Sequence, residues 1–120
     1  MEFNDKLPIY VQVMDILKVK ISSGEIEPGG KLLSVRDFSK ELKVNPNTIQ
    51  RAYQELEREG LVYTQRGMGT FATEDLDVIN TFKKDEVKEL IRKFIEDIIS
   101  LGYEKDDILN IVEEYLKRED

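Results

Sequence analysis

The sequence of 120 residues contains neither cysteine nor histidine. Without cysteine there is no disulfide and no thiol nucleophile, and the lack of both residue types removes Cys/His metal sites and histidine acid–base catalysis. No apolar run approaches the length of a membrane span, and the first ten residues lack the basic start and apolar core of an export signal. The composition therefore predicts a soluble, cytoplasmic protein without a Cys/His metal site, for which no cofactor is expected, and it argues against an enzyme.

Basic residues are outnumbered, with 18 Lys and Arg against 25 Asp and Glu, so the net charge is −7. The excess lies in the C-terminal part: residues 1–73 hold ten basic and ten acidic residues, whereas residues 74–120 hold eight and fifteen. This balance argues against unspecific electrostatic coating of nucleic acid. The neutral front part can still gather several cations on one side, which leaves sequence-specific DNA binding open. These cations are Lys31, Arg36, Lys43, Arg51 and Arg66.

Residues 44–72, VNPNTIQRAYQELEREGLVYTQRGMGTFA, combine a helix with a hairpin. Asn45 is a favourable N-cap, and Pro46 suits the first helical position. Apolar residues then recur at helical spacing, and Gly60 stands where a left-handed residue ends a helix. Two β-prone runs, 61–65 and 70–73, are joined by the glycine-rich tip RGMG. The order predicts a recognition helix followed at once by a basic β-wing. The apolar positions of the helix are Ile49, Ala52, Tyr53 and Leu56.

The other face of this predicted helix carries amide and arginine side chains. Asn47, Gln50 and Gln54 form one row, and each presents a donor beside an acceptor, which matches the adenine edge in the major groove. Arg51 lies next to the row, where its guanidinium can reach a phosphate or a guanine. An ordinary solvated helix face would use the same residue types, because Gln and Arg are good helix formers. The cap, the polar row and the hairpin tip together favour DNA binding.

This stretch resembles the second half of GntR-type winged helix-turn-helix domains, and in particular the short YtrA-like branch, whose members carry a VNPNT–RAY–ELE–EGL–RGxGTF pattern. The likeness covers about residues 7–73. It implies a mainly α fold with a small β-wing: a winged helix-turn-helix DNA-binding domain over residues 7–75, then a linker and a two-helix dimerisation hairpin over residues 76–120. It also implies a transcriptional regulator, most often a repressor and often of transporter operons, that occupies a promoter-proximal operator.

Upstream of this stretch the pattern predicts two further helices. The first runs over about residues 9–22 and is followed by Gly24 as a stop. Leu32 and Leu33, the latter at a position where the family usually has proline, are expected to form a strand that completes a three-stranded wing sheet. Ser34 then caps a second helix, and Lys43-Val44 is the turn into the recognition helix. The residues expected to face the core are Ile9, Val13, Ile16, Leu17, Ile21, Val35, Phe38 and Leu42.

Carried over position by position, the resemblance places the DNA contacts on Ser34, Arg36, Asn45, Asn47, Thr48, Gln50, Arg51, Arg66 and Gly67. Arg36 stands near the positive end of a helix, where a cation is unfavourable without an anionic partner. That partner is either Asp37 or Glu41 in a surface ion pair, or a DNA phosphate or base, and DNA is favoured. Arg66 and Gly67 are expected at the minor groove, although Gly67 would suit a tight hairpin in any case. Pro46 and Gln50 depart from the basic residue and arginine of longer members, which predicts a different operator.

Residues 74–84 are polar and poorly periodic and are therefore predicted to be a linker or the lead-in to a helix. From Asp85 a broad apolar stripe predicts one helix that ends at Gly102, and a second helix follows over about residues 105–117. Two such helices cannot bury this stripe between themselves. Packing on the winged domain is one solution, and two-fold pairing with a second chain is favoured over it. The predicted dimerisation residues are Val87, Leu90, Ile91, Phe94, Ile95, Ile98, Ile108, Leu109, Val112, Tyr115 and Leu116.

A two-fold dimer would present two recognition helices and so predicts an inverted-repeat operator. A winged helix that binds a protein partner is the alternative from another class, but such a module would not need the amide row together with Arg36, Arg51 and Arg66. An enzyme is the weakest alternative, because the acidic pairs Asp106-Asp107 and Glu113-Glu114 are typical of solvated helix surface. Fewer than fifty residues follow the wing, so any small-molecule effector is expected at the dimer interface or around residues 74–84; nothing identifies one.

Overall fold

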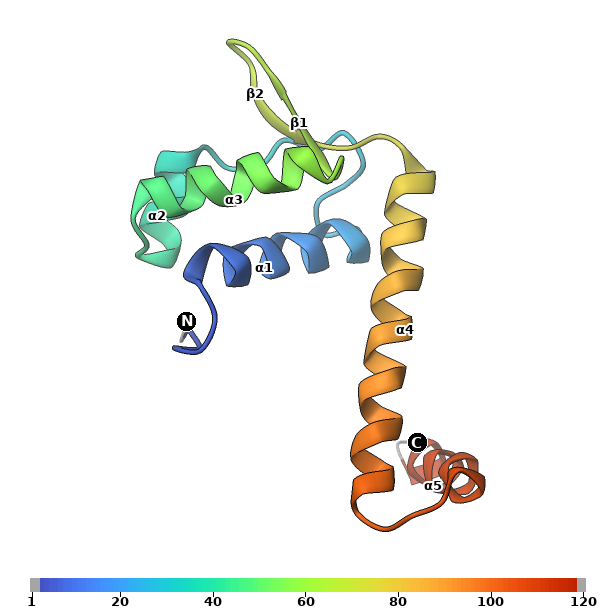
Figure 1. Ribbon diagram of the computed structural model, residues 1–120. Helices are drawn as coiled ribbons and strands as arrows, with labels where there is room; N and C mark the ends of the chain where they lie inside the picture. The colour runs from blue at the N-terminus through green and yellow to red at the C-terminus, as the bar shows by residue number, and fades with distance from the viewer. Residues whose placement is uncertain (1–2, 119–120) are drawn as a thin grey trace. The chain divides into compact units, whose positions relative to one another are not determined.

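The computed structural model describes residues 3–118 and has five helices and one β-hairpin within that range (Figure 1). The predicted mainly α fold with a small β-wing is confirmed. The contacts within the chain group the protein into two compact units, one ending at Phe82 and the other beginning at Lys83. The elements in order are α1 (Ile9–Ser23), α2 (Val35–Leu42), α3 (Pro46–Arg58), β1 (Val62–Gln65), β2 (Gly69–Ala72), α4 (Leu76–Ser100) and α5 (Lys105–Arg118).

The core of the first unit lies between α1, α2 and α3. All four apolar positions predicted for α3 are buried, and Phe38 of α2 packs its ring 6.3 Å from that of Tyr53. The stripe on α1 begins one turn later than predicted, since Ile9 is 44% exposed and Met14 is buried. Periodicity specifies which face of a helix is apolar, but it does not specify how far along the helix the core extends. The buried residues of α1 are Val13, Met14, Leu17 and Ile21.

Two sharp turns set the directions of α3 and of the hairpin that follows it. Lys43, between α2 and α3, has a φ of 57°, and the backbone N–H of Val44 donates to Ser39 O (3.0 Å). At the end of α3, Gly60 has a φ of 81°. Its N–H donates to Glu57 O and that of Leu61 to Leu56 O, both at 3.0 Å, which is the hydrogen-bond pattern of a Schellman motif. The predicted glycine stop is confirmed.

The wing is a two-stranded antiparallel sheet in which Val62 pairs with Ala72 and Gln65 with Gly69. The predicted third strand at Leu32–Leu33 is wrong: a single bridge joins Lys31 to Phe71. Leu32 is buried in the core and Ser34 already caps α2, so no longer stretch of this segment is free to pair. The bridge is nevertheless well bonded, because Leu32 N–H donates to Thr70 O and Ala72 N–H to Gly30 O, both at 2.8 Å.

Helix α4 begins at Leu76 and not near Asp85 as predicted, so residues 74–84, expected to be a linker or the lead-in to a helix, are helical from Leu76 onward. Asp75 starts the helix, since its Oδ1 accepts from the N–H groups of Asp77 (3.0 Å) and Val78 (3.4 Å). Val78, Ile79 and Phe82 then pack against the core of the first unit. The cap at Asp75 and these apolar residues are thus present in the sequence, but they stand in a polar stretch whose helical periodicity is weak.

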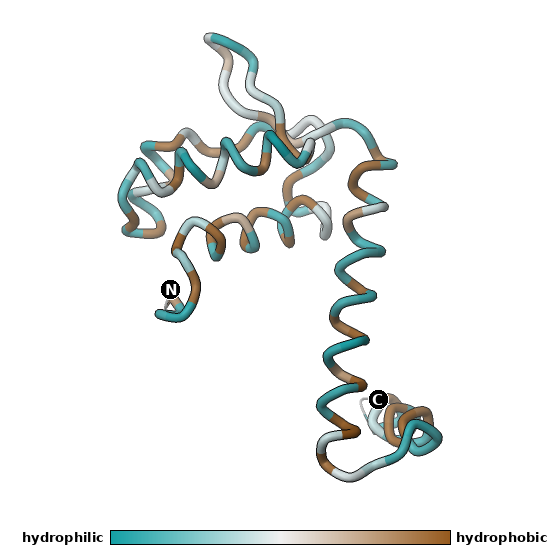
Figure 2. Tube along the Cα trace, in the orientation of Figure 1, coloured by the Kyte–Doolittle hydropathy of each residue, from teal (hydrophilic) through white to brown (hydrophobic). Residues whose placement is uncertain are grey.

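In the second unit α4 ends at Ser100, with Gly102 at a φ of 101° and its N–H donating to Ile99 O (2.9 Å). Helix α5 carries acidic residues in its first turn, as predicted. Figure 2 shows hydrophobic residues recurring along both helices, yet no residue of α5 is buried. Within residues 3–118 no helix is sufficiently long and apolar to cross a membrane.

Candidate nucleic-acid interface

The outward face of α3 carries the predicted row of amide side chains. Because Ile49, Ala52, Tyr53 and Leu56 are all buried on one side of the helix, Asn47, Gln50 and Gln54 are left exposed on the other. Thr48 lies at the flank of this face and is half-buried. The core residues thus hold the polar row in place, and the row itself is free to meet a ligand.

Two of the predicted DNA-contacting residues are also helix caps. Ser34 Oγ accepts from the backbone N–H of Asp37 (3.0 Å) at the start of α2, and Asn45 Oδ1 accepts from that of Asn47 (2.8 Å) at the start of α3. The side-chain O–H of Ser34 and the NH₂ of Asn45 make no hydrogen bond in the part of the chain described. Each residue can therefore stabilise its helix and still donate to a phosphate.

Arg36 and Arg66 have no ion-pair partner within residues 3–118. Arg36 is exposed in the first turn of α2, and the ion pair with Asp37 or Glu41 that was one alternative for it does not form. Arg66 is exposed at the tip of the wing. A cation at a helix N-terminus lacks a favourable local partner, so an anion supplied by another molecule would satisfy it.

Arg51 is held differently, because its guanidinium lies over the ring of Tyr10, with Cζ 3.9 Å from the ring centroid. Tyr10 stands in the first turn of α1 and is half-buried against the core. Such cation–π contacts are made by one face of the planar guanidinium. Sequence reasoning named Arg51 but missed Tyr10, since no spacing rule links two helices that meet only in the folded protein.

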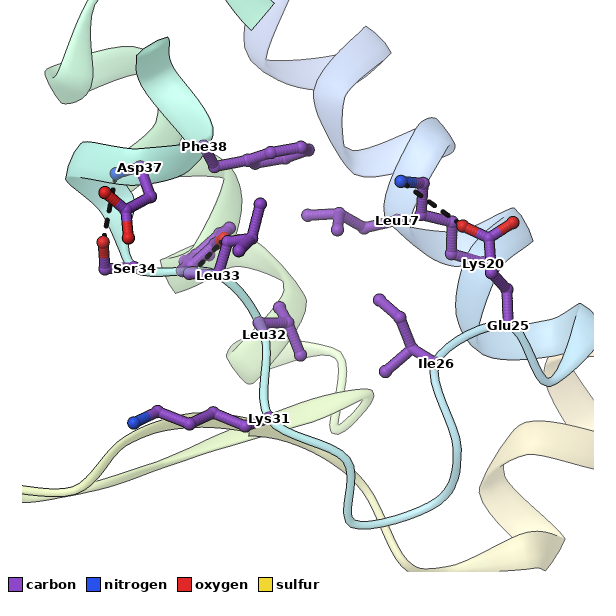
Figure 3. Close-up of a pocket in the computed structure, with 11 residues that line it drawn as sticks. Leu17, Lys20, Glu25, Ile26, Lys31, Leu32, Leu33, Ser34, Asp37 and Phe38 are labelled. Carbon is purple, nitrogen blue, oxygen red and sulfur yellow. Dashed lines mark hydrogen bonds and ion pairs between the residues drawn. The ribbon is translucent and has the colours of Figure 1, made fainter. Parts of the chain in front are cut away.

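The wing tip is a tight turn closed by a hydrogen bond from the N–H of Met68 to Gln65 O (2.9 Å). Gly67, at the third position of this turn, has a φ of 78°, which favours glycine whatever the tip touches. Lys31 lies along the wing, as Figure 3 shows, and a Cβ added to Gly69 would come within 2.8 Å of its Cε. The glycine at position 69 thus lets a second basic side chain lie against the wing.

Glu57 joins the wing to α3. Its Oε2 accepts from the backbone N–H of Thr64 (2.9 Å), which belongs to β1. The helix face that carries Asn47 and Gln54 and the strand that leads to Arg66 are therefore connected by a side chain as well as by the chain itself. Sequence reasoning missed this role, because a glutamate near a helix end is indistinguishable from solvated surface by its pattern.

A cavity of about 410 Å³ lies in the first unit, between the C-terminal half of α1, the 25–34 segment and the start of α2 (Figure 3). Leu17, Ile26 and Phe38 form apolar walls, and the ion pair of Lys20 Nζ with Glu25 Oε2 (3.4 Å) lies at its rim. Within residues 3–118 no three acidic side chains converge as a metal site would require.

Residues 9–72 match the family described as "Bacterial regulatory proteins, gntR family". The chain is 40% identical over 108 residues to the uncharacterised HTH-type transcriptional regulator YhcF of Bacillus subtilis (strain 168), covering 90% of this chain and 89% of that protein. It is 36% identical to the HTH-type transcriptional repressor YtrA of the same bacterium, covering 89% and 83%. A solved structure of a GntR family transcriptional regulator from Listeria monocytogenes matches with a TM-score of 0.86 and 43% identity, over 93% of this chain and 98% of that one.

The family match covers more than half of the chain, and both Bacillus relatives align over most of it. The folded domain presents the features that the residue pattern predicted: a capped α3, its outward amide row and a glycine-tipped wing. The chain therefore belongs to the GntR family and is a DNA-binding transcriptional regulator, not an enzyme.

Proposed function

We propose that this regulator is a sequence-specific repressor that acts as a homodimer on an inverted-repeat operator. The observation that carries the proposal is the outward row of Asn47, Gln50 and Gln54 on α3. Three arginines accompany this row and have no ion-pair partner among residues 3–118, namely Arg36, Arg51 and Arg66. Repression is supported by the likeness to YtrA, which is itself described as a repressor. The genes under control, including a transporter operon as the family likeness implies, remain part of the proposal.

On DNA, the start of α3 would enter the major groove, where Asn and Gln each match adenine with a donor and an acceptor. Arg36 and Arg51 would lie at phosphates, and these contacts fix the register of the protein without reading bases. Arg66 would reach the adjacent minor groove, which is narrow and electronegative in A·T-rich sequence. The predicted contacts of Ser34, Asn45, Thr48 and Gly67 belong to the same surface.

Dimerisation is supported by the apolar side chains that α4 and α5 leave exposed. Val87, Leu90, Ile91 and Phe94 of α4 and Leu109, Tyr115 and Leu116 of α5 are each more than 40% exposed in the single chain. Ile95, Ile98, Ile108 and Val112 are half-buried. Burying one large aliphatic side chain fully contributes on the order of 1.5–3 kcal/mol, so an exposed surface that contains several such side chains favours a partner. Two-fold pairing with a second copy is the commonest closed solution.

Repression would follow from occupancy: a dimer bound across a promoter-proximal operator blocks access of the transcription machinery. The test is selection of bound sequences from random double-stranded DNA with the full-length protein. We expect an inverted repeat whose half-site centres lie a whole number of helical turns apart. Enrichment of no sequence would contradict the proposal, and enrichment of a single half-site would contradict the dimeric part of it.

A further inference from the structure

We infer that Tyr10 is a positioning residue for DNA recognition, which holds the guanidinium of Arg51 in the orientation needed to bind a backbone phosphate. The inference rests on the proposed function and adds a residue to it from outside the helix-turn-helix. Tyr10 belongs to the first turn of α1, whereas all the DNA contacts predicted from the sequence lie on or beside α2, α3 and the wing.

The geometry leaves Arg51 able to make two contacts at once. Cζ of Arg51 lies 3.9 Å from the ring centroid of Tyr10, a separation short enough for the planar guanidinium to stack on the ring through one face. Its N–H groups lie in the guanidinium plane and point outward from its edge, so stacking does not consume them. The edge matches two oxygens of a phosphate in the bidentate manner typical of arginine. A lysine has no such separation of face and edge.

The acidic residue best placed to compete for Arg51 is already paired. Glu55 stands four residues further along α3, where a salt bridge with Arg51 would ordinarily form. Its Oε1 instead pairs with Arg58 Nη1 (3.3 Å). Arg51 makes no ion pair within residues 3–118, so stacking orders its side chain while its charge stays available for an anion from another molecule.

Ordering matters because a free arginine loses much rotamer freedom when it binds. Tyr10 is itself held by packing against the core, so it supplies a fixed platform. Part of the conformational entropy of Arg51 is therefore lost on folding and is not lost again on binding. Removal of the ring would weaken DNA binding through Arg51 and would not change the number of phosphates contacted.

The test compares operator affinity for Tyr10→Leu and Tyr10→Phe, each alone and combined with Arg51→Ala, with the operator taken from the selection experiment. Leu keeps an apolar side chain against the core, and Phe keeps the ring and loses only the hydroxyl. We expect Tyr10→Leu to weaken binding about two- to fivefold, the range that a solvent-accessible cation–π contact supports. Tyr10→Phe should bind like the wild type, and Tyr10→Leu should have no further effect once Arg51 is alanine.

Salt titration supplies a readout that a purely structural role would not reproduce. Arg51→Ala should reduce the slope of log affinity against log salt by about one, the value for one lost phosphate contact. Tyr10→Leu should leave the slope unchanged. Equal losses from Tyr10→Leu in both backgrounds, or equal losses from Leu and Phe, would overturn the inference. A wild-type protein that selects no DNA would overturn the proposed function and the inference with it, whereas normal wild-type selection with an inert Tyr10→Leu overturns only the inference.

Discussion

Arg66 is the single basic residue of the wing tip, and its charge has no partner within residues 3–118. We expect Arg66→Ala to weaken operator binding and to reduce the salt slope by about one. Arg92→Ala is the matched control, because it also removes one positive charge but from α4, where Arg92 pairs with Glu89 (2.8 Å) and Glu96 (2.7 Å). Equal salt slopes for both variants would show that Arg66 makes no specific contact.

Substitution of Gln50 tests whether α3 reads bases, because the Gln50 side chain carries no charge. Gln50 is exposed in the polar row of α3, and its side chain forms no hydrogen bond in the part of the chain described. Gln50→Ala should relax the sequence preference at one position of each half-site, by about 1–3 kcal/mol of discrimination. The measurement is competition between the selected operator and single-base variants. Discrimination that stays the same would assign the specificity to DNA shape.

Tyr53 links the core to the start of α2, because its hydroxyl donates to Leu33 O (2.7 Å). Burial, with a smaller contribution from Glu41, raises the pKa of Tyr53 well above its usual value. A folded-state pKa above the unfolded one means that the neutral form is favoured in the fold. This contribution to stability is fully present below about pH 10, the ordinary pKa of tyrosine, and is lost as the pH rises above it.

Tyr53→Phe should therefore have two effects on the free energy of unfolding. At pH 8 the loss of the buried hydrogen bond should cost about 0.5–1.5 kcal/mol. Above pH 10 the wild type should lose stability more steeply than the variant, since only the wild type has this phenol to ionise. Urea denaturation at pH 8 and pH 10.5 measures both effects. Parallel pH profiles would mean that Tyr53 does not titrate differently in the folded and unfolded states.

At the scale of elements, α3 and the wing could be predicted from the sequence because their signals are local. The Asn45-Pro46 start, the apolar spacing and Gly60 all act within one turn of the helix. The contacts that join elements could not be predicted in this way. Tyr10 meets Arg51 only once α1 and α3 have packed, and Glu57 meets Thr64 only once the chain has turned at Gly60. Predicting such contacts requires knowledge of how the elements cross.

Glu57 should influence DNA binding through the position of the wing. Glu57→Ala removes the acceptor for Thr64 N–H, so we expect weaker operator binding together with faster hydrogen exchange at that amide. Glu57→Gln keeps an acceptor oxygen and should retain most of the affinity. Glu59→Ala is the control for loss of a charge near the end of α3, where Glu59 pairs with Lys18 Nζ (3.0 Å). Similar affinities for Glu57→Ala and Glu59→Ala would exclude a positioning role.

At the scale of the whole molecule, the apolar stripe predicted on α4 and α5 includes large side chains that are exposed in the single chain, and its pairing with a second copy stays a prediction. Phe94→Glu should convert the proposed dimer to a monomer, because a carboxylate within an apolar interface loses its water without gaining a partner. Phe94→Leu keeps the interface apolar and should remain dimeric. Sedimentation measures the mass of both variants. A dimeric Phe94→Glu protein would place the interface elsewhere.

The monomer should also bind its operator far more weakly, since one recognition helix would then act without the other. Circular dichroism of Phe94→Glu provides the control, because Phe94 is exposed in the single chain and its replacement should leave the helical content unchanged. A Phe94→Glu protein that loses operator affinity but keeps the sedimentation mass of a dimer would separate the DNA-binding role of this region from dimerisation.

The hydrogen bonds made at the two edges of the β-hairpin also affect the solubility of the protein. Exposed strands with unpaired backbone groups are templates on which further copies of a protein can stack. Here the outer margin of β2 is bonded to the segment around Lys31, and on β1 the free N–H of Thr64 is occupied by Glu57. The bonded edge of β2 and the occupied N–H of Thr64 thus leave fewer free backbone groups on which intermolecular sheet growth can begin, and the carboxylate that we expect to position the wing occupies one of these groups.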